Sequence, residues 1–171
     1  MPSSVSTNGK TFIKNEEGYR LTVYYDINNH LTVGYGHKVL PADNLKLNDT
    51  ITIAQADQFF ENDVKTVAED PINKLANVSK MNQTQYDAVA SLVYNGGASG
   101  VLGSSDMIAL LGYELTYLPS YPSGTPQSVI DALYKMVGEA FRYGGSALYA
   151  RRNREADMFC SNKWYGHTKI V

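Results

Sequence analysis

Cysteine is almost absent from this chain of 171 residues, because Cys160 is its single copy and no internal disulfide can form. Cys160 follows Phe159 in a helical pattern, which favours a buried apolar residue over a reactive thiol. Histidine is scarce as well, and His30, His37 and His167 are far apart with no cysteine pair or His-Glu motif beside them. The sequence therefore predicts neither a metal site nor a cofactor.

Long hydrophobic runs are also missing. No stretch approaches the roughly 20 apolar residues of a membrane-spanning helix, so we expect no membrane span. The first nine residues are polar and rich in Ser and Thr, without the apolar core of a secretory signal peptide. We therefore expect synthesis in a cytoplasm, and any export must use another route.

Positive charge is not in excess. The net charge is −2 and the sequence pI is about 5.9, so no basic patch suggests a nucleic-acid partner. Composition is ordinary for a globular protein, with 43% hydrophobic residues. The length fits a single domain over residues 1–171, or two small lobes that share one core. Thirteen Tyr are many; sugars often stack on aromatic faces, but core packing is the more common role.

Apolar periodicity and turn residues predict a mostly α member of the α+β class. Strands are expected over 21–25 and 31–35, with a turn over 27–30. A short helix is expected over 9–17, longer helices over 53–70 and 82–94, and further short ones near 105–111, 128–141 and 146–160. Gly18 is expected to end the first helix, a residue within 49–52 to cap the second, and Pro71 to break or kink the second.

Residues 112–127 form a long connection in which three Pro and two Gly exclude a regular element. Long connections in compact domains are often functional. A harmless insertion and a role at the border of a binding cleft both remain open for this segment.

Glu17, Asp26 and Thr32 are the strongest candidates for chemistry. Glu17 ends a predicted helix, Asp26 ends a predicted strand, and Thr32 lies on the returning strand of the hairpin. A hairpin of this length brings Asp26 and Thr32 near each other. Two separated carboxylates with a hydroxyl beside one of them suit acid/base cleavage of a glycosidic bond. By spacing alone, a solvated helix-end acid and a turn-starting Asp are the commoner explanation.

The wider string around these residues resembles the phage-type lysozymes and endolysins of glycoside hydrolase family 24. Glu17, Asp26 and Thr32 are followed by Val-Gly-Tyr-Gly-His at 33–37. Two further blocks, 82–97 and 147–159, resemble that family's central helix and its C-terminal Arg-Arg helix. The resemblance implies a lysozyme-like two-lobe fold. A small β-hairpin lobe with a connecting helix would span 18–70, and a helical lobe would span 79–171 together with the N-terminal helix.

The resemblance also implies roles for single residues. Glu17 would be the general acid, Asp26 the carboxylate on the opposite sugar face, and Thr32 a holder of the attacking water. Four further residues fall where the family contacts its glycan: Lys38, Tyr94, Asn95 and Gly96. For Tyr94, simple core packing is an equal alternative.

Some neighbouring residues are better explained by structure. We expect His37 to be a hydrogen-bonded support under the hairpin and Glu16 to be solvated, because it lies about 100° around a helix from Glu17. Arg151 and Arg152 are expected to pair helices rather than bind substrate.

The implied function is a muramidase that cleaves the β-1,4 bond between N-acetylmuramic acid and N-acetylglucosamine in peptidoglycan, with inversion, and so lyses bacterial cells. The expected partners are glycan strands and a holin-type helper; the protein would be a monomer and act in the periplasm or cell wall. Two alternatives remain: a secreted antibacterial effector with an immunity protein, and a non-catalytic glycan-binding relative. The chain departs from the family in its 112–127 connection and in having its one Trp at 164.

Overall fold

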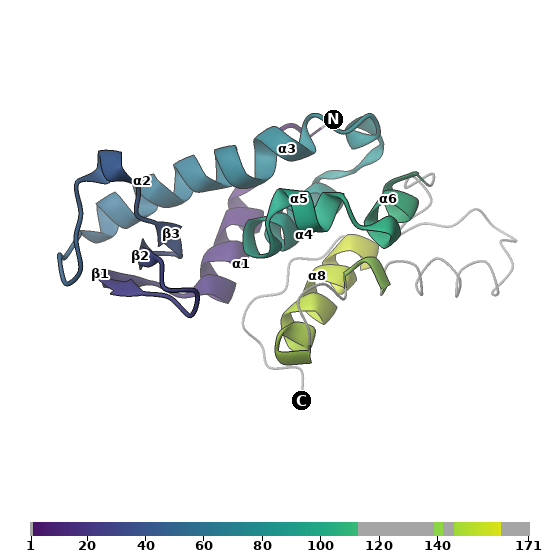
Figure 1. The fold of residues 1–171 in the computed structure, drawn as a ribbon. Coiled ribbons are helices and arrows are strands. Elements are labelled where there is room, and N and C mark those ends of the chain that lie inside the picture. The colour runs from purple at the N-terminus through teal and green to yellow at the C-terminus, as the bar shows by residue number, and fades with distance from the viewer. Residues whose placement is uncertain (1, 113–138, 142–145, 162–171) are drawn as a thin grey trace, which may run out of the picture.

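A continuous helical run over residues 53–72 joins a small sheet to a group of helices (Figure 1). The computed structural model describes residues 2–112, 139–141 and 146–161. The three antiparallel strands, in the order β1-β2-β3, are β1 (Arg20–Tyr25), β2 (Leu31–Gly34) and β3 (His37–Lys38). The fold is a mostly helical α+β arrangement with a small β-containing part and a helical part, as the sequence predicted.

Helical elements make up the rest of the described fold. The joining run consists of α2 (Ile53–Asp63), the π-helix η2 (Val64–Glu69) and α3 (Asp70–Ile72). The remaining elements are α1 (Thr7–Glu17), η1 (Pro41–Asp43), η3 (Val78–Lys80), α4 (Gln83–Gly96), α5 (Ala98–Leu102), α6 (Ser105–Gly112), η5 (Ser146–Leu148) and α8 (Tyr149–Ser161). Of these, α5 was not predicted, and α6 and α8 lie where short helices were expected.

Helix α1 begins and ends at local signals. The Ser6 hydroxyl accepts a hydrogen bond from the Gly9 N–H at 3.0 Å and donates one to the Asp87 carboxylate, which anchors the helix start on α4. The helix ends at Glu17, and Gly18 follows with φ of +63°, in the region that favours glycine. The predicted end of this helix is therefore confirmed, and Glu17 lies in its last turn.

Strand register divides the sheet into two faces. Val33 pairs with His37, and this face packs on α2, where the His37 ring stacks on Phe59 with ring centroids 4.2 Å apart. Gly34 lets the sheet approach closely, because a Cβ there would lie 3.3 Å from the Cβ of Ala56. The opposite face carries Tyr24, Thr32 and Lys38, which form one row because Thr32 pairs with Tyr24 on one side and with Lys38 on the other.

The joining run begins where the sequence predicted and ends one residue past Pro71. Thr52 caps α2 through a reciprocal bond with Gln55, as a capping box requires. A break or kink was expected at Pro71, and the helix passes through this residue and ends at Ile72. The turn before the proline is π-helical, and the Asp70 N–H bonds Lys65 O, five residues earlier. We attribute the continuity to this wider turn, which relieves the clash that proline causes in an α-helix.

Helix α4 forms the centre of the helical part. Asn82 caps it and Gly97, with φ of +78°, follows its last residue, so it ends slightly later than predicted. Every residue from 84 to 93 is buried, so the burial is not confined to one apolar face of the helix. Packing of α1, α8 and the joining run around α4 explains this burial.

Several predicted features lie outside the described residues. These are residues 113–127 of the long connection, most of the helix expected over 128–141, Trp164 and His167. Within the described ranges, no helix is long and apolar enough to cross a membrane, and no cluster of ligands fits a metal ion. Cys160 is buried as expected, and burial raises the pKa of its thiol to about 12.

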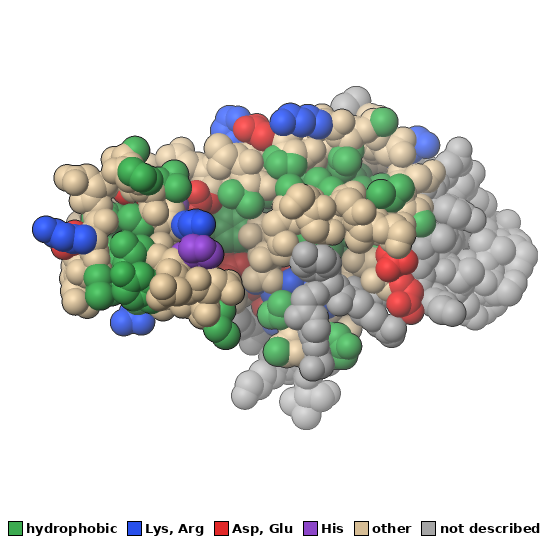
Figure 2. Space-filling model, in the orientation of Figure 1, with side chains coloured by type: hydrophobic (Ala, Val, Ile, Leu, Met, Phe, Trp, Pro, Cys, Tyr) green, Lys and Arg blue, Asp and Glu red, His purple; other side chains and the backbone are tan. Residues whose placement is uncertain are grey.

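On the face drawn in Figure 2, basic and acidic side chains of the described residues are scattered over both parts of the molecule.

His37 fixes the sheet to the joining run. Its Nδ1 lies 2.8 Å from Asp63 Oδ2 and its Nε2 lies 3.1 Å from Asp43 Oδ2, and the side chain is 7% exposed. Burial alone would lower the pKa of His37, but the two carboxylates outweigh burial and raise it above its usual value of 6.5. The supporting role predicted for His37 is confirmed, although its partners were not foreseen.

We predict that the stabilisation from His37 depends on pH. Because its pKa is raised in the folded state, the stabilisation is complete below the unfolded value of 6.5 and is lost as pH rises through the folded pKa. His37→Asn should lower the free energy of unfolding by about 1–3 kcal/mol at pH 5.5, since it leaves buried acceptors unsatisfied. Urea unfolding of both proteins between pH 5.5 and 9 measures the difference, which should shrink as pH rises. A difference that does not change with pH would contradict the assignment.

Candidate active site

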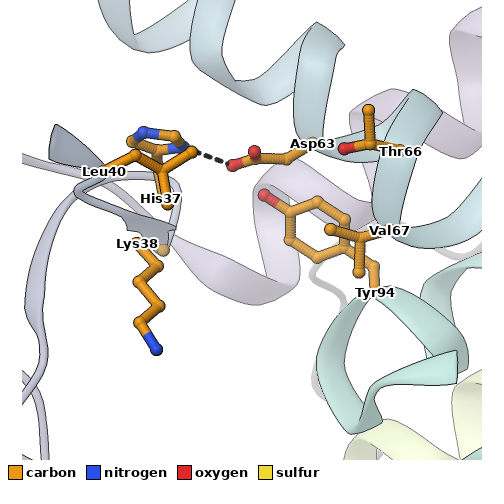
Figure 3. A pocket seen from close by; sticks show the side chains of 8 residues that line it. His37, Lys38, Leu40, Asp63, Thr66, Val67 and Tyr94 are labelled. Carbon is orange, nitrogen blue, oxygen red and sulfur yellow. Dashed lines mark hydrogen bonds and ion pairs between the residues drawn. The ribbon is translucent and has the colours of Figure 1, made fainter. Parts of the chain in front are cut away.

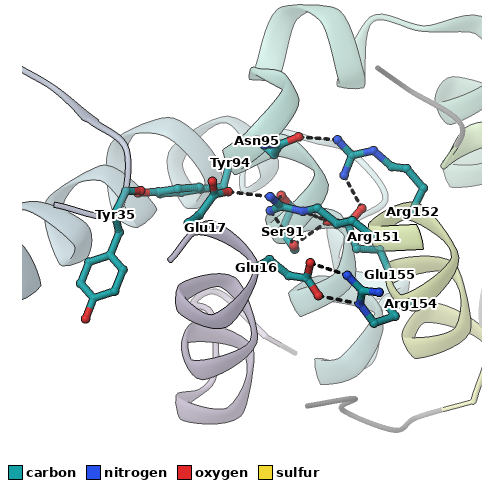
Figure 4. Close-up of polar contacts among 10 residues, drawn as sticks. All are labelled: Glu16, Glu17, Tyr35, Ser91, Tyr94, Asn95, Arg151, Arg152, Arg154 and Glu155. Atoms are coloured by element: carbon teal, nitrogen blue, oxygen red, sulfur yellow. Dashed lines mark hydrogen bonds and ion pairs between the residues drawn. The ribbon is translucent and has the colours of Figure 1, made fainter. Parts of the chain in front are cut away.

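Glu17 lies where α1 ends, between the sheet and α8 (Figure 4). Its Oε1 accepts a hydrogen bond from Arg151 Nη1 at 2.7 Å, and its side chain is 17% exposed. A short charge-assisted bond of this kind fixes the orientation of the carboxyl group. Glu17 is therefore a partly exposed acid whose carboxylate is oriented by the guanidinium of Arg151.

Arg151 is itself held by buried groups. Its Nε donates to Glu155 Oε1 at 2.8 Å, and its Nη2 donates to the Ser91 carbonyl and hydroxyl oxygens at 3.2 Å each. Burial opposes the charge on the guanidinium, but Glu17 and Glu155 raise the pKa of Arg151 above its usual value. Arg151 therefore carries its charge and links α8, α4 and the end of α1.

Arg152 completes the contact between α8 and α4. Its Nη1 donates to Glu155 Oε2 at 2.6 Å and its Nη2 to Asn95 Oδ1 at 2.5 Å. The helix-pairing role predicted for Arg151 and Arg152 is confirmed by these bonds. The Asn95 side chain, expected at the glycan, uses its oxygen to bind Arg152, and Gly96 is the last residue of α4.

The expectation that Glu16 is solvated was wrong. Both of its carboxylate oxygens accept from Arg154, at 2.6 Å from Nε and 2.7 Å from Nη2, and its side chain is 7% exposed. The rotation around the helix that separates Glu16 from Glu17 turns it toward α8 rather than toward water. Glu16 therefore joins α1 to α8.

Asp26 lies at the start of the hairpin turn, with its side chain 30% exposed. Its Oδ1 accepts from the backbone N–H of His30 at 2.8 Å and of Asn28 at 2.9 Å. The bond from the His30 backbone is the largest cause that lowers the pKa of Asp26 below its usual value. Asp26 is therefore an ionised carboxylate at neutral pH, which suits a base or a stabiliser of positive charge.

Thr32 lies near Asp26 at the turn end of the hairpin. Thr32 pairs with Tyr24, and Asp26 follows the last residue of β1, where its backbone N–H donates to the His30 carbonyl at 2.9 Å. The Thr32 hydroxyl donates to the His30 carbonyl at 3.1 Å, and Thr32 as a whole is buried. The predicted nearness of the two residues agrees with this register.

A pocket of about 270 Å³ lies beside β3, η2 and the end of α4 (Figure 3). Its lining includes Lys38 and Tyr94, two of the residues expected to contact the glycan. The Tyr94 hydroxyl donates to the Tyr35 carbonyl at 3.1 Å. Burial, followed by the charges of Asp63 and Glu17, raises the pKa of Tyr94, so its hydroxyl remains protonated. Tyr94 is therefore both a packed residue and part of the pocket wall.

Sequence reasoning missed the contacts that cross from one element to another. The bond from Arg151 to Glu17 joins residues 134 positions apart, and the bond from Ser91 to Glu155 joins residues 64 apart. One signal was present: Arg151 and Glu155 are four residues apart, a spacing that brings side chains together on a helix.

Known proteins are similar to this chain in sequence and in architecture. The family described as phage lysozyme matches residues 14–117. The endolysin of Salmonella phage P22 is 34% identical over 160 residues, which cover 92% of this chain and 98% of that protein. The endolysin of an Acyrthosiphon pisum secondary endosymbiont phage is 37% identical over 101 residues, which cover 59% of this chain and 65% of that protein.

Solved structures agree with this assignment. A mutant of P22 lysozyme superposes with a TM-score of 0.65 at 30% identity, covering 92% of this chain and 99% of that one. The endolysin of Escherichia coli O157:H7 phage FAHEc1 has a TM-score of 0.66 at 21% identity, with coverage of 95% and 96%, and supports the fold alone. The chain belongs to the phage lysozyme family, the muramidases that degrade peptidoglycan.

Proposed function

We propose that Glu17, Asp26 and Thr32 hydrolyse the β-1,4 bond between N-acetylmuramic acid and N-acetylglucosamine, with inversion at the anomeric carbon. The observation that carries the proposal is the placement of two carboxyl groups on different elements. Glu17 ends α1 and is held by Arg151, whereas Asp26 and Thr32 lie at the turn end of the hairpin. This arrangement fits an acid and a base that act from opposite sides of a sugar ring.

Glu17 protonates the oxygen of the leaving sugar in this mechanism. Arg151 binds its Oε1, and no described residue hydrogen-bonds its Oε2. One carboxyl oxygen is therefore fixed in place while the other is available to carry the proton. A general acid needs this combination of a set orientation and a free oxygen within reach of the substrate.

Asp26 and Thr32 together activate the water. Asp26, ionised through its backbone bonds, accepts the proton of a water molecule that the Thr32 hydroxyl orients. The bond from Thr32 to the His30 carbonyl turns the hydroxyl lone pairs away from that carbonyl, where a water can donate to them. The water then attacks the anomeric carbon from the face opposite the leaving group.

Lys38 and Tyr94 line the proposed glycan site, with Asn95 and Gly96 at its border on α4. The protein would be made in the cytoplasm of a host cell and act on the wall as a monomer after a holin-type helper opens the membrane. The endolysin names of its relatives favour this route over a secreted effector with an immunity protein. A non-catalytic relative is disfavoured because both carboxylates and the threonine are present.

Glu17→Gln should abolish nearly all hydrolysis while leaving the fold intact. General acid catalysis contributes about 10²–10⁴-fold, and a poor sugar leaving group places the loss near the upper end. The measurement is the loss of turbidity of purified peptidoglycan. The matched control is Glu61→Gln, because the Glu61 side chain is 50% exposed and forms a surface ion pair with Lys10. Turnover within threefold of wild type by Glu17→Gln would remove Glu17 from the mechanism.

The first product should have the inverted anomeric configuration. An inverting site leaves about 6.5–9.5 Å between its carboxyl groups for a water, against about 5–5.5 Å in a retaining site. A hydroxyl beside Asp26 has a clear task only when a water must be held. NMR of the products from a soluble glycan, recorded before mutarotation, reads the configuration. Net retention would mean that Asp26 or another group acts as a nucleophile, and that Thr32 does not orient a water.

A further inference from the structure

His30 contacts both residues of the proposed water-activating pair through its backbone. Its N–H donates to Asp26 Oδ1 at 2.8 Å, and its carbonyl accepts from the Asp26 N–H at 2.9 Å and from the Thr32 hydroxyl at 3.1 Å. None of these three bonds uses an atom of the imidazole. A substitution of the side chain can therefore remove the ring while the backbone bonds that hold Asp26 and Thr32 are kept.

The ring of His30 lies beside the second oxygen of the same carboxylate. Its Nδ1 is 3.5 Å from Asp26 Oδ2, and the His30 and Asp26 side chains are 46% and 30% exposed. The backbone N–H groups of Asn28 and His30 both bind the other oxygen, Oδ1. Oδ2 is therefore the oxygen that can receive the proton of the attacking water, and a titratable ring lies next to it.

Few other charged groups lie on the elements around this turn. The titratable side chains of the neighbouring strands and of the facing helix end are Arg20, Tyr24 and Tyr25 on β1, Lys38 on β3 and Glu17 on α1. Among the described residues, His30 is the one ion-pair partner of Asp26. The other groups are common to the wild type and to any variant at position 30, so a difference between such proteins reports on the ring.

Asp26 itself does not change charge near neutral pH. The bond from the His30 backbone is the largest cause that lowers the pKa of Asp26, and the charge of the His30 ring lowers it further. Asp26 is therefore ionised over the range between pH 5 and 8, in which histidine side chains ordinarily gain or lose their charge. A change in the strength of this base within that range has to come from the group beside it.

We propose that His30 is a positioning residue that sets the strength of Asp26 as a base. When the imidazole is neutral, Oδ2 is free to accept the proton of the water that Thr32 orients. When the imidazole is protonated, it pairs with Oδ2, stabilises the negative charge and competes with the water for that oxygen. A more stabilised carboxylate accepts a proton less readily, so hydrolysis slows on the acid side. The inference rests on the proposed function, in which Asp26 is the base.

The test measures kcat on a soluble peptidoglycan glycan from pH 5 to pH 8 for the wild type, His30→Gln and His30→Lys. Glutamine is uncharged, and lysine carries a cation over this range. At pH 5 His30→Gln should be about two- to fivefold faster than the wild type, the range of an exposed ion pair, and the two should converge by pH 8. His30→Lys should equal the wild type at pH 5 and be about two- to fivefold slower at pH 8.

The ratio of each variant to the wild type cancels the titration of Glu17, which all three proteins share. A ring with a merely structural role would give ratios that do not change with pH, and that result would overturn the inference. The control is Lys80→Gln, which removes an exposed cation on η3 in the helical part of the molecule. Its kcat should follow the wild type at every pH.

A measurement without substrate separates this inference from the proposed function. The Asp26 carboxyl group is titrated by ¹³C NMR in the wild type and in His30→Gln. Loss of the neighbouring cation should move the midpoint of the Asp26 titration to higher pH, because this charge helps to lower the pKa of Asp26. A midpoint that does not move would overturn the inference and leave the proposed function standing. Wild-type kcat in Asp26→Asn would instead count against the proposed function.

Discussion

The buried carboxylate of Glu155 is the group on which the geometry of the site depends. It is 0% exposed, and its two oxygens accept from Ser91, Arg151 and Arg152. A buried charge without partners is costly, and breaking such a pair destabilises a protein by about 3–5 kcal/mol. The network therefore fixes how α8 packs on α4. This packing places the guanidinium of Arg151 against Glu17, so a helix far from Glu17 in sequence determines the orientation of the proposed acid.

Asp26 and Thr32 are positioned by local interactions rather than by an ion-pair network. Asp26 is oriented by backbone N–H groups of its own turn, and Thr32 by strand register. The sheet that carries them is fixed to the joining run through His37 and Asp63, and through the close approach of Gly34 to Ala56. One carboxyl group is therefore positioned by a tertiary ion-pair network and the other by local hydrogen bonds. A rigid helix connects the two supports, and the π-helical turn within it lies at the pocket.

Local features were predictable because their causes lie within a few residues. The capping box at Thr52, the helix end before Gly18 and the hairpin around Asp26 follow from residue types that adopt those conformations alone. The π-helical turn before Pro71 and the partner of Glu16 were not predictable, since they depend on packing between segments distant in sequence. The roles of the candidate residues came from a resemblance, because two acids and a threonine are common on any surface.

The most direct test of this account is a double-mutant cycle on kcat for peptidoglycan with Glu155→Gln and Arg151→Lys, each checked for folding by thermal unfolding. Arg151→Lys keeps the charge but loses the planar fork that binds several acceptors at once. If both residues act by orienting Glu17, each change should lower kcat about tenfold or more, because small misplacements of reacting groups are costly. The double variant should then be no slower than the slower single variant. Additive losses, or variants that keep the wild-type kcat, would contradict the account.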